Sequence, residues 1–185
     1  MIIMKTHVIQ LLDHYPIQIF PHQKTLIMFD IDGVVCRETI NLHKPDVKLT
    51  PEQIEMEQMS CVCTPEFIKT IQELKKFPNI DIKFNTGRKV SVKEATQQMF
   101  TNAGLPINVE KDVTFYPTSA KWEIPDYLRI KSQVIYNEIP QYDKIHYVDD
   151  SDVLIEHLQD QQHQCPQCSY YLFKQNPQRI SSLKN

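Results

Sequence analysis

The chain has 185 residues, of which 41% are hydrophobic and 23% are charged, and its formal net charge is -3 at pH 7. This length suits one compact domain over residues 1–185, and the composition lacks the low hydrophobicity and high charge that are typical of disorder. The weak net charge excludes a general attraction to nucleic acid or to an anionic membrane surface, so a polyanionic substrate would need a local basic patch.

The first residues and the cysteine content favour a cytoplasmic location. Lys5 and His7 interrupt the apolar residues at the N-terminus, which is unlike a signal peptide, and no later segment approaches the roughly 18 apolar residues of a membrane span. Five cysteines, an odd number, favour reduced thiols over a disulfide framework. We therefore predict a cytoplasmic protein with no membrane partner, and the sequence leaves the oligomeric state open.

The first third of the chain contains one strong strand signal. Residues 5–14 place apolar side chains at helical spacing, so a helix is expected there. The run TLIMFDI, residues 25–31, is apolar up to its acids, which is typical of a strand buried on both faces of a parallel sheet. Residues 34–64 have no clean period and are interpreted as an irregular insert with one short helix at residues 51–59.

Helices and strands then alternate toward the C-terminus. Helices are predicted at residues 64–76, 91–103, 127–139 and 153–158, and strands at residues 80–86, 113–117, 144–150 and 169–173. Such alternation implies right-handed crossovers between parallel strands. The predicted fold class is α/β, a three-layer Rossmann-like parallel sheet with helices on both faces.

Glycine is rare, with three residues where average usage would give about thirteen. Gly104 lies in a helix-ending context, whereas Gly33 and Gly87 each follow an apolar strand. Glycine allows a positive φ or the close approach of another group, so these two positions are candidates for a site.

Acidic and polar side chains follow the predicted strands where the strands end. Asp30 and Asp32 follow the first one, Thr86 follows the second, and Asp149 and Asp150 follow a later one. The carboxyl ends of strands in an open α/β sheet share one crevice, so these groups should lie together. Carboxylates buried together need a cation or a proton to offset their repulsion, and all-oxygen ligands favour Mg²⁺.

Gly33 indicates that the chain turns directly after Asp32. Asp30 and Asp32 would face the same side only if the strand continued. A turn would instead direct the Asp32 side chain toward a leaving group and its carbonyl toward the metal.

The motifs DIDGV and NTGR, then a lysine near the start of a helix, Lys131, and then YVDD occur in this order. Together they resemble the haloacid dehalogenase superfamily of phosphatases, over roughly residues 24–175. The resemblance implies a HAD-like fold with a small or absent cap. Residues 34–64 would form that cap or flap, and a short loop at residues 117–126 occupies the other usual cap position.

This resemblance also implies roles for individual residues. Asp30 would attack phosphorus to form an aspartyl-phosphate, and Asp32 would protonate the leaving oxygen and then activate water. Thr86, neighbouring backbone amides and Lys131 would stabilise the phosphoryl group. The guanidinium of Arg88, directly after Gly87, suits a phosphate, so these two residues are candidate substrate contacts.

Asp149 and Asp150 would complete the Mg²⁺ site with Asp30 and Asp32. The family pattern favours Asp150 as the more direct ligand, but the sequence does not rank the two acids. Lys121 competes with Lys131 for the lysine role, and Asp152 is a candidate to orient that lysine.

The substrate is left open. The motif spacing resembles, more loosely, the phosphatase domain of polynucleotide kinase-phosphatases, which implies a nucleic-acid end or a nucleotide. A phosphatase of a small metabolite is the alternative. Two further classes are a phosphoacceptor signalling domain, whose paired acids come first in the chain, and a non-catalytic binding module that retains the fold.

Two cysteine pairs raise the question of zinc. Cys61 and Cys63 form CVC, and Cys165 and Cys168 form CPQC. Four thiolates could hold zinc, but the predicted topology places the first pair at the catalytic rim and the second at the opposite edge of the sheet. The sequence leaves open whether any of the four binds zinc.

Overall fold

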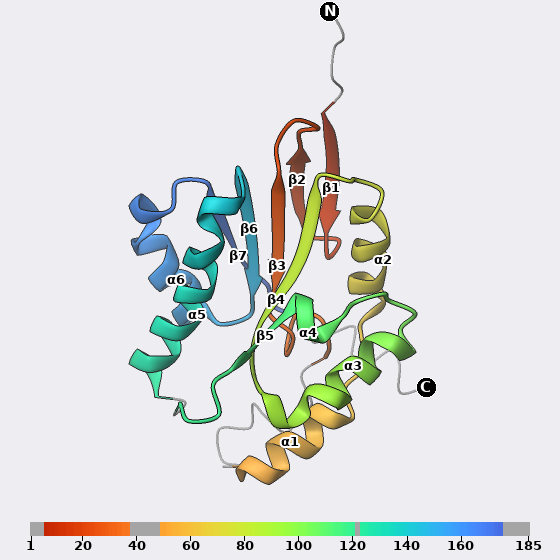
Figure 1. The fold of residues 1–185 in the computed structure, drawn as a ribbon, viewed down its shortest axis with the longest axis vertical. Helices are drawn as coiled ribbons and strands as arrows, with labels where there is room; N and C mark the ends of the chain where they lie inside the picture. Colours follow the sequence, from red (N-terminus) through yellow and green to blue (C-terminus); the bar gives the residue numbers. More distant parts are fainter. Residues whose placement is uncertain (1–5, 38–48, 121–122, 176–185) are drawn as a thin grey trace, which may run out of the picture.

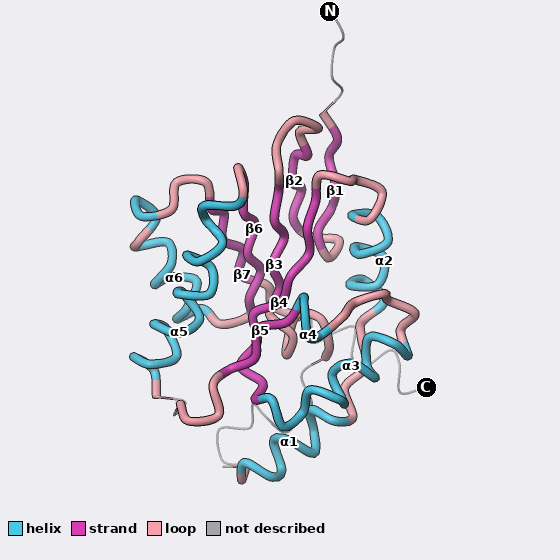
Figure 2. Tube along the Cα trace, viewed as in Figure 1, coloured by secondary structure: helices cyan, strands magenta, loops and turns pink. Residues whose placement is uncertain are grey.

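The structure is a computed structural model that describes residues 6–37, 49–120 and 123–175. Its centre is a parallel sheet of five strands in the order β5-β4-β3-β6-β7 (Figures 1 and 2). The strands are β3 (Thr25–Phe29), β4 (Ile80–Lys89), β5 (Val113–Tyr116), β6 (Lys144–Asp149) and β7 (Cys168–Leu172). Each lies where a strand was predicted, although β4 continues three residues further.

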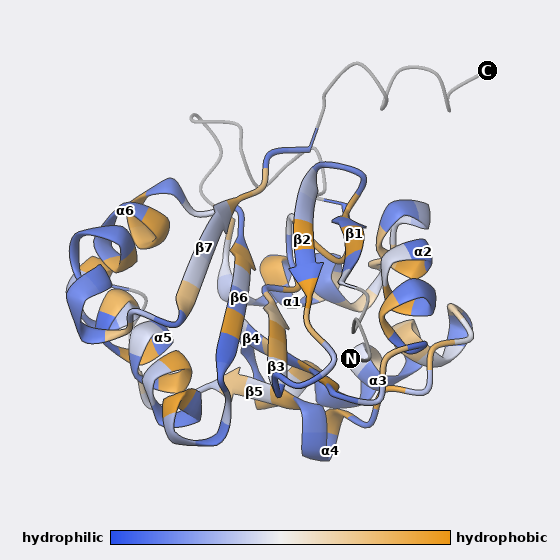
Figure 3. Cartoon of the chain, turned by 90° about the horizontal axis from the view of Figure 1, so that it is seen from above, coloured by the Kyte–Doolittle hydropathy of each residue, from blue (hydrophilic) through white to orange (hydrophobic). Residues whose placement is uncertain are grey.

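Helices cover both faces of the sheet, so the predicted three-layer α/β architecture is confirmed. One face carries α2 (Pro65–Leu74) and α3 (Lys93–Asn102), and the other carries α5 (Ile124–Glu138) and α6 (Asp152–Asp160) (Figure 3). The predicted helix at residues 51–59 is α1 (Pro51–Met59), which contacts α3. The shorter helices are α4 (Val109–Asp112), η1 (Val90–Val92), η2 (Ile139–Gln141) and η3 (Gln162–Gln164).

The position of β3 at the centre of the sheet explains why its sequence is apolar without alternation. All five of its residues are buried, because both faces of the strand are covered. Ile27 and Phe29 belong to the core beneath α2 and α3, whereas Leu26 and Met28 belong to the core beneath α5 and α6. The strand is therefore held from both sides, and its carboxyl end has a well-defined position.

Aromatic rings fix α2 against the sheet. The Phe67 ring of α2 meets Phe29 of β3 edge-on, with ring centroids 5.4 Å apart, and lies 6.0 Å from Phe84 of β4. Phe84 in turn lies 5.0 Å from Phe100 of α3. Such tilted and edge-on pairs add to the free energy gained by burying the rings.

Side-chain caps explain where three of the helices begin. Thr50 and Gln53 form a capping box at α1, Thr64 accepts from the N–H of Phe67 at α2, and Ser151 does so from Leu154 at α6. Each cap satisfies a backbone N–H that has no partner within its helix. These polar residues mark helix starts that the sequence already indicated at residues 51 and 64.

Residues 7–19 form an antiparallel hairpin, so the helix predicted over residues 5–14 is wrong. β1 (His7–Leu11) pairs with β2 (Tyr15–Ile19), and a turn with positive φ at Leu12 and Asp13 joins them. Alternate residues of the hairpin are buried in the core shared with α2, namely Ile9, Leu11, Ile17 and Ile19. A short apolar run fits both the helical period and the strand period of apolar residues. Pairing with β2 makes this run a strand.

Cys165 and Cys168 are joined by a disulfide in the loop before β7, with Cα atoms 5.5 Å apart. The N–H of Cys168 donates to the carbonyl of Cys165 at 3.1 Å, and this turn brings the two side chains together. The prediction that all the thiols are reduced is therefore wrong for this pair, because local turn geometry is not visible in the cysteine count. Cys36, Cys61 and Cys63 carry free thiols.

Within the described segments, the helices are too short or too polar for any of them to cross a membrane.

His146 is a buried titratable side chain on β6. Only 4% of its surface is exposed, its Nδ1 lies 2.8 Å from the Tyr171 hydroxyl, and its ring stacks on the Tyr171 ring. Burial lowers the pKa of His146 from its ordinary 6.5 to about 4, and the charge of Lys144 acts in the same direction. The folded chain therefore keeps His146 neutral at a pH at which the unfolded chain protonates it.

We expect acidification from pH 6.5 to about 4 to reduce the free energy of unfolding through His146. The unfolded chain binds the extra proton in this window, so the contribution, about 3 kcal/mol at most, is complete above pH 6.5 and lost below it. Urea unfolding across this window compares the wild type with His146→Gln, whose side chain does not titrate. The variant should lose less stability than the wild type, and equal losses would contradict the prediction.

Candidate active site

The candidate site lies at the carboxyl ends of β3, β4 and β6. Phe29, the last residue of β3, pairs with Phe84 of β4 and Val148 of β6, so the residues that follow all three emerge at one edge. The N–H of Asp30 also donates to the carbonyl of Val148 at 2.9 Å. The shared strand edge predicted from the sequence is therefore present.

Lys131 reaches this edge from α5 and is completely buried. Its Nζ lies 2.8 Å from Oδ1 of Asp30 and 3.1 Å from Oδ2 of Asp149, and it donates to the carbonyl of Asn85 at 2.5 Å. The Asn85 side chain donates back to the carbonyl of Lys131 at 2.8 Å. The structure thus brings Lys131 together with two of the predicted carboxylates.

Both oxygens of Asp149 accept hydrogen bonds from the protein. The Tyr147 hydroxyl donates to Oδ2, which also faces Lys131, and the N–H of Ser151 donates to Oδ1 at 2.9 Å. Asp149 is fully buried. These contacts fix its carboxylate in one orientation.

Gly33 lies directly against the Asp150 carboxylate. Gly33 has a φ of +81°, and a Cβ at this position would lie 2.1 Å from Oδ2 of Asp150. The positive φ therefore favours glycine, and any side chain here would have to displace the Asp150 carboxylate. The sequence had indicated Gly33 as a turn, and the structure adds a steric reason.

Asp30, Asp149 and Asp150 form a cluster that fits a hard divalent cation. One carboxylate oxygen from each lies within 4.8 Å of the others. Burial raises the pKa of Asp30 to about 7, although the Lys131 ammonium lowers it, and the charge of Asp149 raises it further. A cation would relieve this repulsion, and the all-oxygen donor set matches Mg²⁺.

The Asp32 carboxylate is paired with the Arg88 guanidinium. Nε of Arg88 lies 3.0 and 3.2 Å from the two Asp32 oxygens, and a terminal nitrogen lies 2.7 Å from Oδ1. The Gln58 side chain of α1 also donates to Asp32 at 3.4 Å. The turn at Gly33 therefore separates the two aspartates, as the sequence indicated.

Arg88 is completely buried, and its hydrogen bonds lie inside the protein. Besides Asp32, its guanidinium donates to the hydroxyl of Thr96 at 3.1 Å and to Sγ of Cys36 at 3.4 Å. The sequence placed Arg88 against substrate phosphate, whereas the structure places it beneath Asp32. The sequence indicated that the Arg88 guanidinium binds an anion. That anion is the carboxylate of Asp32, which lies 56 residues away in the chain.

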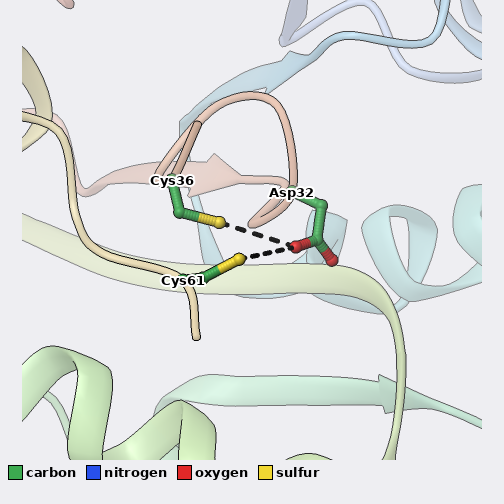
Figure 4. Close-up of side chains that lie close together, drawn as sticks. All are labelled: Asp32, Cys36 and Cys61. Atoms are coloured by element: carbon green, nitrogen blue, oxygen red, sulfur yellow. Dashed lines mark hydrogen bonds between the residues drawn. The ribbon is translucent and has the colours of Figure 1, made fainter. Parts of the chain in front are cut away.

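Two thiols complete the surroundings of Asp32. Figure 4 shows Cys36 and Cys61 with their sulfur atoms directed at the Asp32 carboxylate, at 3.5 and 4.0 Å from Oδ1. A hydrogen bond from Cys36 lowers the pKa of the Cys61 thiol, although burial opposes it. Sequence reasoning did not connect these thiols with Asp32.

Thr86 and Gly87 lie in the part of β4 that is irregular relative to β5. Thr86 is 1% exposed, and its hydroxyl accepts from the N–H of Arg88 at 3.1 Å. Gly87 is half-buried, and a Cβ there would lie 4.0 Å from the Tyr127 ring, which is ordinary contact. Gly87 is therefore not required sterically in the way that Gly33 is.

Asp152 does not orient Lys131, contrary to one expectation from the sequence. It is exposed at the start of α6 and accepts from the N–H of Val153 at 3.0 Å. Asp149 and Asn85 hold the lysine instead. Asn85 is the first residue of the NTGR motif, which could have indicated it, and the rival Lys121 lies outside the described residues.

Two grooves adjoin the site. One, of about 420 Å³, is lined by Gly33, Asp150, Ser151, Asp152, Phe173, Lys174 and Gln175. The other, of about 310 Å³, lies between α1 and the loop after β5 and is lined by Pro51, Glu55, Gln58, Lys89, Thr118, Ser119 and Ala120. Each groove has one lysine in its wall.

The two cysteine pairs lie at opposite edges of the sheet. Cys63 forms a backbone bridge with Cys36, beyond the carboxyl end of β3, and Cys61 is two residues away. Cys168 pairs with Ile145 at the amino end of β6. The described structure therefore does not bring the four cysteines into one zinc site, in agreement with the topological argument from the sequence, and Cys165 and Cys168 are joined in a disulfide.

Comparisons with known proteins show the fold. No family model and no curated protein matches the sequence. Among solved structures, the HAD domain of the effector protein Lem4 from Legionella pneumophila is 14% identical, with a TM-score of 0.52, covering 87% of this chain and 93% of that chain. A chain of a Pnkp1/Rnl/Hen1 complex is 12% identical, with a TM-score of 0.56 and coverages of 83% and 47%.

The class C acid phosphatase from Bacillus anthracis with tungstate bound is a third similar structure. It is 14% identical, with a TM-score of 0.54, and the match covers 84% of this chain and 68% of that chain. The chain therefore has the HAD-like fold that the motifs implied. At these identities the similarity concerns the fold, so the activity must be argued from the site.

We predict that Gly33→Ala weakens Mg²⁺ binding roughly 10- to 100-fold, because the new Cβ would displace the Asp150 carboxylate. Isothermal titration calorimetry with MgCl₂ measures the affinity. Gly104→Ala is the matched control, since Gly104 has a φ of +69° but nothing within 4 Å of an added Cβ. Equal Mg²⁺ affinities for the Gly33 variant and the wild type would contradict the prediction.

Proposed function

We propose that the chain is a Mg²⁺-dependent phosphomonoester hydrolase that acts through an aspartyl-phosphate. The observation that carries this proposal is the buried Lys131 ammonium between Asp30 and Asp149, with Asp150 beside them at a groove. A carboxylate nucleophile, a fixed positive charge and a hard-metal donor set at one strand edge are the parts that phosphoryl transfer requires. The fold shared with an acid phosphatase supports the same reaction class.

Asp30 is the proposed nucleophile. Its carboxylate would attack phosphorus in line, the bond to the leaving oxygen would break, and water would later hydrolyse the aspartyl-phosphate. Lys131 donates to Oδ1 of Asp30 at 2.8 Å, which fixes the side chain and favours its ionised form against the effect of burial. When bound by Asp30, Asp149, Asp150 and the carbonyl of Asp32, Mg²⁺ would neutralise negative charge on the phosphoryl group.

Asp32 is the proposed acid and base. It would give a proton to the leaving oxygen and later take one from the attacking water. Its side chain is 26% exposed, so a substrate can reach it, whereas Arg88 beneath it is fully buried. We propose that Arg88 positions Asp32, and that Asp32 turns from the guanidinium toward the leaving oxygen during each proton transfer.

Thr86, the Gly87 amide and Lys131 are the proposed contacts to the phosphoryl oxygens. Thr86 lies on β4 next to Asn85, whose carbonyl accepts a hydrogen bond from Lys131. This bond holds the lysine against the strand that carries Thr86. Hydroxyl, amide and ammonium groups that donate to the phosphoryl oxygens would stabilise the charge of the transition state.

Residues 34–64 are proposed to form a small cap. Its described part includes α1, which lies beside α3 at the bottom of Figure 1. Gln58 of α1 contacts Asp32 directly, so this segment meets the proposed acid. The grooves on both sides leave room for a phosphate on a large molecule.

A nucleic-acid end or a nucleotide is the proposed substrate. Lys174 in one groove and Lys89 in the other each offer an ammonium group to a substrate phosphate, beside the acids Asp150 and Asp152 in the first groove and Glu55 in the second. The motif spacing and the fold shared with a chain of a Pnkp1/Rnl/Hen1 complex support this class. A small phosphorylated metabolite is the alternative that the same grooves admit.

Asp30→Asn should lower the hydrolysis of p-nitrophenyl phosphate at least about a thousandfold, because the amide is a poor nucleophile. EDTA should abolish wild-type activity, and added Mg²⁺ should restore it. Asp160→Asn, an exposed acid at the end of α6, is the control and should keep full activity.

Three outcomes would contradict this assignment. Full activity of Asp30→Asn would exclude Asp30 as the nucleophile. A wild-type chain that is phosphorylated stably without turnover would be a phosphoacceptor domain. A chain that neither hydrolyses nor accepts phosphate would be a non-catalytic binding module.

If the substrate is a nucleic-acid end or a nucleotide, as proposed, we expect faster turnover of 3′-phosphorylated oligonucleotides or nucleotides than of sugar phosphates. Release of inorganic phosphate measures kcat/KM across the three groups at equal Mg²⁺. Inactivity on the oligonucleotides and nucleotides beside clear activity on sugar phosphates would favour the metabolite alternative.

A further inference from the structure

Cys36 and Cys61 form a thiol pair at the edge of the proposed active site. Their sulfur atoms and one Asp32 oxygen all lie within 4.8 Å of one another (Figure 4). Cys36 closes the turn that carries Asp32, and Cys61 follows α1. Both cysteines therefore belong to the described part of the proposed cap, and Cys36 also closes the turn of the proposed acid.

A metal ion is a poor explanation for this cluster. The Arg88 guanidinium lies 2.7 Å from Oδ1 of Asp32 and 3.4 Å from Sγ of Cys36. A fixed positive charge at these distances would repel a second cation in a buried setting. The same charge favours negative charge that develops on the Cys61 sulfur, whereas the Asp32 carboxylate disfavours it.

The backbone already holds the two segments together. Cys36 and Cys63 form an antiparallel bridge, and the N–H of Thr64 donates to the carbonyl of Val35 at 2.9 Å. Cys61 lies two residues before this bridge. The two sulfur atoms therefore belong to segments that the backbone already holds side by side, within 4.8 Å of each other.

The two thiols differ in exposure. Cys61 is half-buried and open to a small oxidant, whereas Cys36 is 0% exposed beneath it. This arrangement of an accessible thiol above a buried partner is typical of a reacting and a resolving cysteine.

We propose that Cys36 and Cys61 are a modification site at which hydrogen peroxide forms a reversible disulfide, and that this bond turns off the hydrolase. The second part rests on the proposed function. The disulfide Cys165–Cys168 is separate, since it lies at the opposite edge of the sheet.

The chemistry balances with peroxide as the oxidant. The Cys61 sulfur attacks one peroxide oxygen, the O–O bond breaks, and a sulfenic acid forms while the released hydroxide takes up the thiol proton as water. The Cys36 sulfur then attacks the Cys61 sulfur and displaces its hydroxyl group. The Cys36 proton passes to Oδ1 of Asp32, 3.5 Å away, and then to the departing hydroxide, which leaves as the second water.

The disulfide would hinder Asp32. The turn after Asp32 is closed by hydrogen bonds from Val35 and Cys36 to the carbonyl of Ile31. Tying Cys36 to Cys61 would fix this turn to the segment after α1 and keep Asp32 against Arg88. If Asp32 does not turn to the leaving oxygen, it does not transfer its proton. The rate enhancement that general acid–base catalysis supplies, about 10²- to 10⁴-fold, is then lost.

The test treats the full-length chain with hydrogen peroxide and measures two quantities. Mass spectrometry of alkylated, non-reduced peptides detects a Cys36–Cys61 cross-link. Hydrolysis of p-nitrophenyl phosphate is measured before oxidation, after it, and after dithiothreitol. Cys36→Ser and Cys61→Ser remove the pair, and Cys63→Ser is the matched control, because Sγ of Cys63 faces the carbonyl of Met99 instead.

We expect the cross-link and an at least about tenfold loss of activity, reversed by dithiothreitol, in the wild type and in Cys63→Ser. The ratio of activity before and after peroxide should stay near one in Cys36→Ser and Cys61→Ser. No cross-link, or one through Cys63, would overturn the site, and a cross-link with unchanged activity would overturn the switch. A reduced chain without phosphatase activity would overturn the proposed function and the switch, while the cross-link would still decide the thiol site.

Discussion

The buried ammonium of Lys131 is the interaction on which the site depends. An unpaired charge in the core would be very unfavourable, so Lys131 requires the carboxylates of Asp30 and Asp149 and the carbonyl of Asn85. Asn85 donates back to the carbonyl of Lys131, which joins β4 to α5 at two points. One cation therefore holds the ends of three strands and one helix in a common arrangement.

A second buried cation, the Arg88 guanidinium, gives Asp32 a partner different from that of Asp30. Asp30 faces Lys131, whereas Asp32 faces Arg88 on the other side of the turn at Gly33. The turn needs glycine, because a Cβ there would meet the carboxylate of Asp150. Two acids that lie close in the sequence thereby have different partners, and such different surroundings are what the different roles proposed for Asp30 and Asp32 would require.

The surroundings of Asp32 connect the proposed chemistry to the proposed cap. Gln58 of α1 donates to Asp32, and Cys61 beyond that helix faces the same carboxylate as Cys36. A movement of the described part of the proposed cap, caused by substrate entry or by a covalent bond between the thiols, would therefore change the contacts of the proposed acid, Asp32. The proposed nucleophile Asp30 has a separate partner, the Lys131 ammonium.

The sequence by itself determined the sheet and the strand edge where the acids gather. Long apolar runs such as TLIMFDI, and caps such as Thr64 before Pro65, are local signals, so the structure confirms them. The helix expected over residues 5–14 failed because a short apolar run fits two periods until β2 pairs with it. Only the tertiary structure decided the partners of the charged groups, since Lys131 and Asp30 are 101 residues apart and Arg88 and Asp32 are 56 apart. Burial makes such pairs obligatory, but the folded packing selects which carboxylate each cation meets.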